Sequence, residues 1–238
     1  MNAIILAAGE GKRLIPSGWS KPKCLLPAGR ITLLDNILLS LVEHGVSQAA
    51  IVVGYQQERV RAAAAAHNLK LRFFVNPDYV DTNTIYSLYL AREAMTEDFI
   101  YFNADVLLDR RIVGRLLEAD GSALAIETKR CGREEVKVIA DGNGRIRRIG
   151  KELAPRRCMG EFIGVGKFCT PMMADFLEAL RYYNDEGKQR KLFFEAAVDR
   201  ICGRHEILAV DIDPYAAIEI DTPQDLAKAG ELAKALGL

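Results

Sequence analysis

Near its N-terminus the chain reads Ala3-Ile4-Ile5-Leu6-Ala7-Ala8-Gly9-Glu10-Gly11-Lys12-Arg13-Leu14. Its first six residues are all apolar, which is typical of a strand buried on both faces of a sheet. The two glycines that follow let the backbone turn sharply and come close to a ligand. Backbone N–H groups beside Lys12 and Arg13 suit a polyphosphate. The stretch therefore predicts a buried first strand with an anion-binding loop at its carboxyl end.

A second basic stretch follows, Lys21-Pro22-Lys23-Cys24-Leu25-Leu26-Pro27, and the next clear helix begins only near Thr32. A loop of this length inside a compact domain is usually functional or disordered, and its charge favours a site. The dinucleotide-binding fingerprint fails here, because Leu14 stands where its third glycine belongs and no helix follows. No P-loop motif occurs. A plain glycine turn remains the alternative to a phosphate site.

Apolar segments then alternate with helical patterns. Strands are expected at 49–53, 71–75 and 99–102, and helices at 32–45, 56–67 and 84–95. This alternation predicts a parallel sheet with right-handed crossovers. Asp105 closely follows the strand at 99–102 and should lie near the glycine loop, where open α/β sheets bind ligands.

The second half of the chain is richer in hairpins. After a helix at 110–119, strands are expected at 123–127, 161–168, 207–211 and 216–220, and helices at 170–183 and 191–202. The turn Asp141-Gly142-Asn143-Gly144 predicts a hairpin between 135–140 and 145–150. Thr222, Pro223 and Asp225 predict the start of a last helix.

Composition limits the classes of partner. The 238 residues carry a formal net charge of zero, so nucleic acid and anionic membranes are not expected as main partners. No segment is long enough to span a membrane. Five scattered cysteines without a C-x-x-C pair predict neither a zinc site nor a disulfide framework, and they fit a reducing cytoplasm.

The two basic stretches resemble the signature L-A-A-G-x-G-x-R-L followed by P-K-x-L. This signature belongs to nucleotidyltransferases that join a nucleoside triphosphate to a sugar phosphate or a phospho-alcohol. The resemblance implies an α/β fold of the Rossmann-like, GT-A type, with a mixed, mostly parallel central sheet flanked by helices. It implies one domain over 1–238, with a nucleotide-binding half at 1–122 and an acceptor-binding half at 123–238.

Two further segments narrow the branch. Residues 76–91 resemble the N-x-x-Y and N-x-x-S-L-Y-L-A run of cytidylyltransferases acting on phosphocholine and related compounds, and residues 219–225 resemble their E-I-D-[ST]-x-x-D segment. The resemblance implies Mg²⁺-dependent transfer of CMP from CTP to a small phosphorylated or phosphonylated alcohol, with release of pyrophosphate. A sugar-1-phosphate nucleotidyltransferase using another triphosphate and a non-catalytic nucleotide-sensing subunit remain alternatives. The oligomeric state stays open, with a homodimer among the options.

The resemblance also implies residue roles. Lys23 and Arg13 are the expected catalytic cations, on the transferred phosphate and the leaving pyrophosphate, and Asp105 and Asp221 are the expected Mg²⁺ ligands. Helix capping is the alternative for Asp221 and Asn83, and solvated surface charge is the alternative for the cations. The expected nucleotide-binding residues are Leu6, Ala7, Ala8, Gly9, Gly11, Arg13, Lys23, Tyr79, Asn83, Ser87 and Asp105.

Lys137, Lys151 and Glu161 are the expected acceptor-binding residues. Where a trimethylammonium group would need an aromatic cage, this chain has Val136 and Lys137. A lysine there would repel a quaternary ammonium and favour a phosphate, a carboxylate or hydroxyl groups. We therefore expect a polar acceptor without a quaternary ammonium; surface positions on a hairpin are the alternative for these three residues.

Overall fold

The first strand, β1 (Asn2–Ala7), lies inside the main sheet, between β4 (Gln48–Val53) and β6 (Phe99–Asn103), and is parallel to both. β5 (Lys70–Val75) extends this parallel part beyond β4. Alternate residues of β1 enter two different cores, since Ile4 and Leu6 belong to one cluster and Ile5 and Ala7 to the other. The predicted strand buried on both faces is confirmed. The computed structural model describes the backbone of residues 1–238 and every side chain except those of residues 15–17.

One long strand, β11 (Gly160–Phe168), joins the second half of the chain to the first. It is antiparallel to all three of its neighbours: β8 (Ser122–Glu127) pairs along one side, while β6 and β9 (Lys137–Ala140) pair with successive stretches of the other side. β9 forms the predicted hairpin with β10 (Ile146–Gly150), and β12 (Ile207–Asp211) is parallel to β8. The sheet is therefore mixed, as expected.

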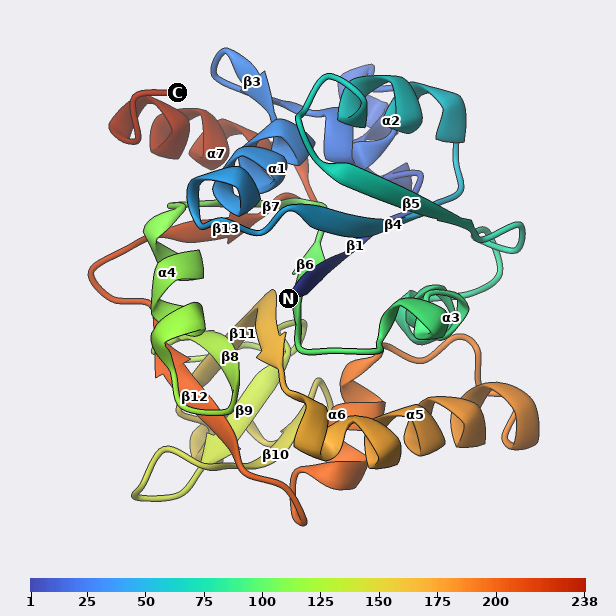
Figure 1. Ribbon diagram of the computed structural model, residues 1–238. Coiled ribbons are helices and arrows are strands. Elements are labelled where there is room, and N and C mark those ends of the chain that lie inside the picture. The colour runs from blue at the N-terminus through green and yellow to red at the C-terminus, as the bar shows by residue number, and fades with distance from the viewer.

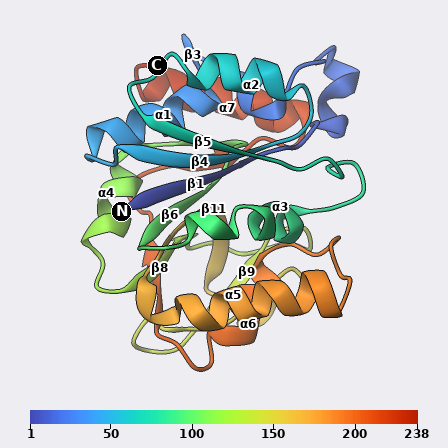
Figure 2. The same cartoon turned by 45° about the vertical axis from the view of Figure 1, so that its right-hand side comes forward.

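Helices cover both faces of this sheet (Figure 2). α1 (Leu33–Glu43), α2 (Gln57–Ala64) and α4 (Arg111–Glu118) pack against the core that contains Ile5. α3 (Thr84–Leu90), α5 (Met173–Arg181) and α6 (Glu195–Ile201) pack against the core that contains Ile4. α7 (Pro223–Ala235) lies on the same side as α1 and α2 (Figures 1 and 2) and packs on a third cluster. None of the helices in the described chain is both long and apolar enough to cross a membrane.

A small pair of strands links distant parts of the chain. β13 (Ala217–Glu219) pairs antiparallel with β7 (Val106–Leu108), and the N–H of Ile220 donates to the carbonyl of Asp105 at 3.0 Å. The sequence predicted a strand at 216–220 but not β7, because three residues directly after a turn carry no periodicity. The pairing holds the backbones of Asp105 and Asp221 side by side, although the two residues are far apart in sequence.

Some helices are shorter than their patterns predicted. The pattern at 84–95 becomes a 3-10 turn, Arg92–Ala94, after α3, and α5 follows a 3-10 turn, Thr170–Met172, and continues as a π-turn, Tyr182–Glu186. The pattern at 191–202 becomes helical only at Glu195, because residues before it are bonded to the start of α3. The N–H of Phe194 donates to Thr84 Oγ1 at 2.9 Å, and the N–H of Asn83 donates to the carbonyl of Arg190 at 2.8 Å.

The predicted long basic loop contains short elements. They are the 3-10 turns Lys12–Ser17 and Lys23–Leu25 and the two-residue strands β2 (Pro27–Ala28) and β3 (Ile31–Thr32). A further 3-10 turn, Pro155–Arg157, precedes β11. The helices expected to begin near Thr32 and Thr222 both start with a capping box, formed by Thr32 with Asp35 and by Thr222 with Asp225.

Candidate active site

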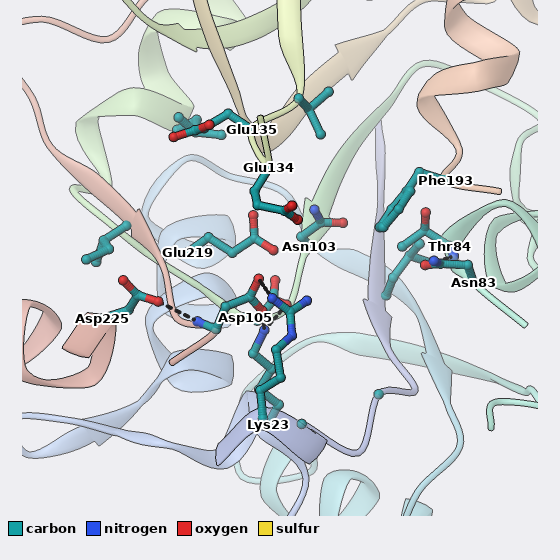
Figure 3. Close-up of a pocket in the computed structure, with 18 of the residues that line it drawn as sticks. Lys23, Asn83, Thr84, Asn103, Asp105, Glu134, Glu135, Phe193, Glu219 and Asp225 are labelled. Carbon is teal, nitrogen blue, oxygen red and sulfur yellow. Dashed lines mark hydrogen bonds and ion pairs between the residues drawn. The ribbon is translucent and has the colours of Figure 1, made fainter. Parts of the chain in front are cut away.

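A cavity of about 830 Å³ opens where β1, β6 and β13 end. It brings together almost all of the residues that the sequence singled out. From the first half of the chain these are Leu6, Ala8, Gly9, Gly11, Arg13, Lys23, Tyr79, Asn83, Ser87 and Asp105; from the second half they are Lys151, Glu161 and Asp221. Figure 3 labels Lys23, Asn83 and Asp105 among them.

Lys23 lies between two carboxylates. Its Nζ is 2.6 Å from Asp105 Oδ2 and 2.5 Å from Asp221 Oδ1, and Arg13 lies 3.1 Å from Asp221 Oδ2. Burial alone would lower the pKa of Lys23, but the charges of Asp105 and Asp221 outweigh it and hold this pKa above its ordinary value. The pKa of Asp221 is lowered, because the ion pair with Lys23 outweighs the cost of burial. Lys23 and Asp221 are therefore both charged at neutral pH.

A third carboxylate completes an acidic cluster. Asp105, Glu219 and Asp221 can place one oxygen each within 4.8 Å of one another. The charge of Asp105, together with burial, raises the pKa of Glu219, so these acids repel one another. Asp105 Oδ1 is buried and has no hydrogen-bond partner in the described chain. Hard carboxylate oxygens, one of them unsatisfied, fit a divalent cation such as Mg²⁺.

Glu219 was missed as a candidate ligand, although a signal for it was present. It lies two residues before Asp221, and residues two apart on an extended segment point to the same side. The segment Glu219-Ile220-Asp221 therefore presents both acids to the cavity, while Ile220 is buried in the cluster under α7.

The glycine loop packs directly against Lys23. Gly11 has φ +72°, and a Cβ atom there would lie 3.2 Å from Lys23 Cβ. A side chain at this position would therefore be both strained and crowded. Ala7 is placed differently from its neighbours: its side chain points into the core on the α1 side, and it is not among the residues that line the cavity. The expected nucleotide contact is therefore not available to the Ala7 side chain.

The segment after β5 forms another part of the wall. Asn76 is 1% exposed, and its Nδ2 donates to Thr82 Oγ1 and to Ser87 Oγ, both at 3.0 Å. Asn83 Oδ1 accepts from the N–H of Thr84 at 2.8 Å, so Asn83 caps α3. Whether Asn83 also contacts a nucleotide stays a prediction, as it does for Ser87 and Tyr79.

Lys137 does not lie where the sequence analysis expected it. Successive residues of a strand point to opposite faces, and here Val136 lines the cavity while Lys137 points away from it. Lys137 is 1% exposed, and its Nζ donates to the carbonyls of Arg133 at 3.0 Å and Glu135 at 2.9 Å. The side chain closes the loop before β9. The acceptor contact expected of Lys137 is therefore corrected to a structural one, and the argument against a cationic acceptor loses its basis.

The other two expected acceptor residues line the cavity. Glu161 shares Lys129 with Glu127, at 2.6 Å for each pair, and Lys151 Nζ lies 4.4 Å from the centre of the Phe193 ring. Burial raises the pKa of Glu161 against the opposing effect of Lys129. Figure 3 shows Glu134 and Glu135 away from Lys23, Glu219 between Glu134 and Asp105, and Phe193 beside Asn83 and Thr84.

Glu195 is a cavity residue that the sequence analysis missed. It is the first residue of α6, is 3% exposed, and its Oε2 has no hydrogen-bond partner among the described residues. Burial raises the pKa of Glu195 to about 7, against a contact with its own N–H and the charge of Lys151. The feature of the sequence that could have pointed to Glu195 is its position as a single acid within the apolar run Phe193-Phe194-Glu195-Ala196-Ala197-Val198.

Comparison with known protein families gives a consistent result. A model of the MobA-like NTP transferase domain matches residues 3–199. The CMP-5'-(3-aminopropyl)phosphonate synthase of Streptomyces rubellomurinus is 29% identical, over 96% of this chain but only 38% of that protein. The CTP:phosphoglutamine cytidylyltransferase of Campylobacter jejuni is 27% identical, over 95% of this chain and 98% of that protein. The chain thus spans well under half of the Streptomyces protein.

The fold also has a close structural counterpart. The CTP:phosphocholine cytidylyltransferase of Streptococcus pneumoniae superposes with a TM-score of 0.82 at 23% identity, over 97% of this chain and 98% of that one. At this level of identity the likeness establishes the fold. It confirms the expected Rossmann-like nucleotidyltransferase architecture with its mixed sheet.

Proposed function

Because the chain belongs to the family of MobA-like NTP transferase domains, we propose that it is a Mg²⁺-dependent cytidylyltransferase. The reaction would transfer CMP from CTP to a small phosphorylated or phosphonylated alcohol and release pyrophosphate. The names of the Streptomyces and Campylobacter relatives support a cytidine nucleotide, since one names a CMP product and the other CTP.

The observation that carries the proposal is the pairing of Lys23 and Arg13 with Asp105 and Asp221, which form an acidic cluster with Glu219 at the mouth of the glycine loop. In the reaction an oxygen of the acceptor phosphate forms a bond to the α-phosphorus of CTP. The bond from that phosphorus to the bridging oxygen breaks, and its electron pair leaves with pyrophosphate. Several negative oxygens have to be brought together, so positioning and charge neutralisation provide most of the catalysis.

The three carboxylates are the residues that would hold Mg²⁺, which would supply positive charge against the phosphate oxygens. In the structure Lys23 forms ion pairs with Asp105 and Asp221. If Mg²⁺ balanced the charge of these two acids, the Lys23 ammonium would be free to contact the transferred phosphate. Arg13 is 64% exposed at the cavity mouth, where it can neutralise the leaving pyrophosphate.

Both halves of the chain would contribute to the reaction. In this proposal residues 1–122 bind the nucleotide, with N–H groups at Gly9 and Gly11 for the phosphates and Ser87, Tyr79 and Asn83 near the base. Residues 123–238 bind the acceptor at Lys151 and Glu161. Two of the three acids for the metal come from the second half, so closure of β13 on β7 is a condition for catalysis.

A pyrophosphate-release matrix tests this function. Each of the four nucleoside triphosphates is combined with phosphocholine, phosphoethanolamine, glycerol phosphate and glucose 1-phosphate in the presence of Mg²⁺. We expect release with CTP and a phospho-alcohol, and loss of release with EDTA. Release with UTP or dTTP and glucose 1-phosphate would replace the proposal by a sugar nucleotidyltransferase. Triphosphate binding without release under any combination would indicate a nucleotide sensor.

A further inference from the structure

The end of the cavity that is lined by residues 127–195, here called the acceptor end, contains a carboxyl group without a partner. This group belongs to Glu195, which lines the acceptor end and is only 3% exposed. Its Oε2 has no hydrogen-bond partner in the described chain. A buried polar group without a partner costs free energy, and a charged one costs more. Such groups are frequent where a ligand supplies the missing contact.

The local fold does not depend on this carboxyl group. The segment before α6 is held by other bonds: Phe194 N–H to Thr84 Oγ1, Asn83 N–H to the carbonyl of Arg190, and Ile85 N–H to the carbonyl of Leu192. The Glu195 backbone starts the helix without a side-chain capping bond. A glutamine could therefore occupy this position, since the carboxyl group makes no contact with another residue that holds the local fold.

The acceptor end as a whole is acidic. Of the residues that line it, five are glutamates and two are lysines, namely Glu127, Glu134, Glu135, Glu161, Glu195, Lys129 and Lys151. Lys129 is shared by Glu127 and Glu161. Lys151 lies over the ring of Phe193, and its charge favours ionised Glu195. This surplus of negative charge favours an acceptor with a positive group.

From this geometry we infer that the acceptor carries a protonated primary amine, and that Glu195 binds this ammonium group. The inference rests on the proposed function in taking the acceptor to be a phosphate or phosphonate. The amine is inferred from the surroundings of Glu195 alone. An ammonium with N–H bonds supplies both the charge and the hydrogen bond that Glu195 lacks.

A quaternary ammonium fits this end of the cavity less well. It has no N–H to donate and is usually held by several aromatic faces. Among the described residues that line the acceptor end, Phe193 is the aromatic one, and Lys151 already covers its ring at 4.4 Å. Glu195 and Asp221 line the same cavity, so a bound acceptor can contact both regions.

The test compares three acceptors that differ in one group: phosphoethanolamine, 2-hydroxyethyl phosphate and phosphocholine. With wild-type protein we expect kcat/KM for phosphoethanolamine to exceed that for 2-hydroxyethyl phosphate by about 10-fold or more, as a charge-assisted hydrogen bond implies. Phosphocholine should also be the poorer substrate. A wild-type preference for the hydroxyl compound or for phosphocholine would overturn the inference.

The variant Glu195→Gln removes the negative charge of this side chain but keeps its shape. The 10-fold preference should fall to within about threefold, mainly through KM for phosphoethanolamine, while 2-hydroxyethyl phosphate changes little. The control is Glu178→Gln, an exposed position on α5 outside the cavity, which should keep the wild-type ratio. An unchanged ratio in Glu195→Gln would also overturn the inference. Thermal melting shows whether the variant is folded, and its Tm should be equal to or above that of the wild type.

This experiment is independent of the identity of the nucleotide. If the matrix above shows that another triphosphate is used, the same ratio is measured with that triphosphate, so the proposed function fails while the amine inference is still tested. If no triphosphate is turned over, the Tm shifts caused by phosphoethanolamine and 2-hydroxyethyl phosphate give the comparison for wild type and Glu195→Gln.

Discussion

The two ends of the cavity handle charge in opposite ways. The phosphate end is formed by the glycine loop, Lys23, Arg13, Asp105, Glu219 and Asp221, and there the two cations are already paired with Asp105 and Asp221 at 2.5 to 3.1 Å. At the acceptor end, Glu195 is buried without a hydrogen-bond partner for its Oε2 among the described residues. Because paired charges keep their ionisation when buried and a lone carboxyl does not, the first end is organised before ligands arrive and the second depends on its ligand.

The largest expected effect is at the phosphate end, at Asp105. Asp105→Asn removes a negative charge from the acidic cluster and should lower pyrophosphate release by on the order of 100-fold or more, with the fold intact. Calorimetry should show weaker Mg²⁺ binding. Asp120→Asn, an exposed position outside the cavity, is the control. Activity within a few-fold of wild type would remove Asp105 from the site.

A similar effect is expected for Lys23. Lys23→Met keeps the stem that packs against Gly11 but removes the charge, so kcat should fall by on the order of 100-fold, more than KM for the triphosphate rises. Without nucleotide, Mg²⁺ should bind more tightly, since Asp105 and Asp221 lose the ammonium that now compensates them. A change in KM alone would make Lys23 a binding residue, and weaker Mg²⁺ binding would contradict the proposed competition.

At the acceptor end, Glu195 should make stability depend on pH. Its pKa is about 7 in the folded protein against 4.5 as the ordinary value, so the folded state binds the extra proton between these pH values. The free energy of unfolding should therefore fall as pH rises from 4.5 to 7, by roughly 3 kcal/mol at most. Denaturant unfolding of wild type and Glu195→Gln across this range measures the difference. Parallel pH profiles would show that Glu195 has no raised pKa.

The smallest effects distinguish two lysines of the second half. Lys137→Met removes the ammonium donor of two partly buried carbonyls, so stability should fall by about 1–3 kcal/mol while acceptor kinetics stay the same. Lys151→Met should change the acceptor KM with little loss of stability, because Lys151 lines the cavity and its ion lies over Phe193. Chemical denaturation and acceptor titrations measure both. The reverse outcome would return Lys137 to the acceptor site.

The phosphate end was largely predictable from local sequence. An apolar run followed by two glycines and a basic residue predicts a strand, a turn and an anion site within a few residues. Lys23 and Asp105 were also singled out from short stretches of this kind. Glu219 was also within reach, because strand periodicity places it on the side of Asp221. Local chemistry is sufficient where the functional groups project from the ends of regular elements.

The acceptor end was decided by the tertiary structure. Whether Val136 or Lys137 faces the cavity depends on the register of β9 against β11, and one residue of shift would exchange them. In the sequence Glu195 is a single acid within an apolar helix. The hydrogen bonds of residues 190–194 to α3 place it at the cavity wall. The sequence by itself determined the strands of the parallel sheet in the first half, the glycine loop and its cations. Only the packing of β11, β13 and α6 decided which acids meet Lys23 and which one is left without a partner, because burial and charge pairing are properties of neighbours in space.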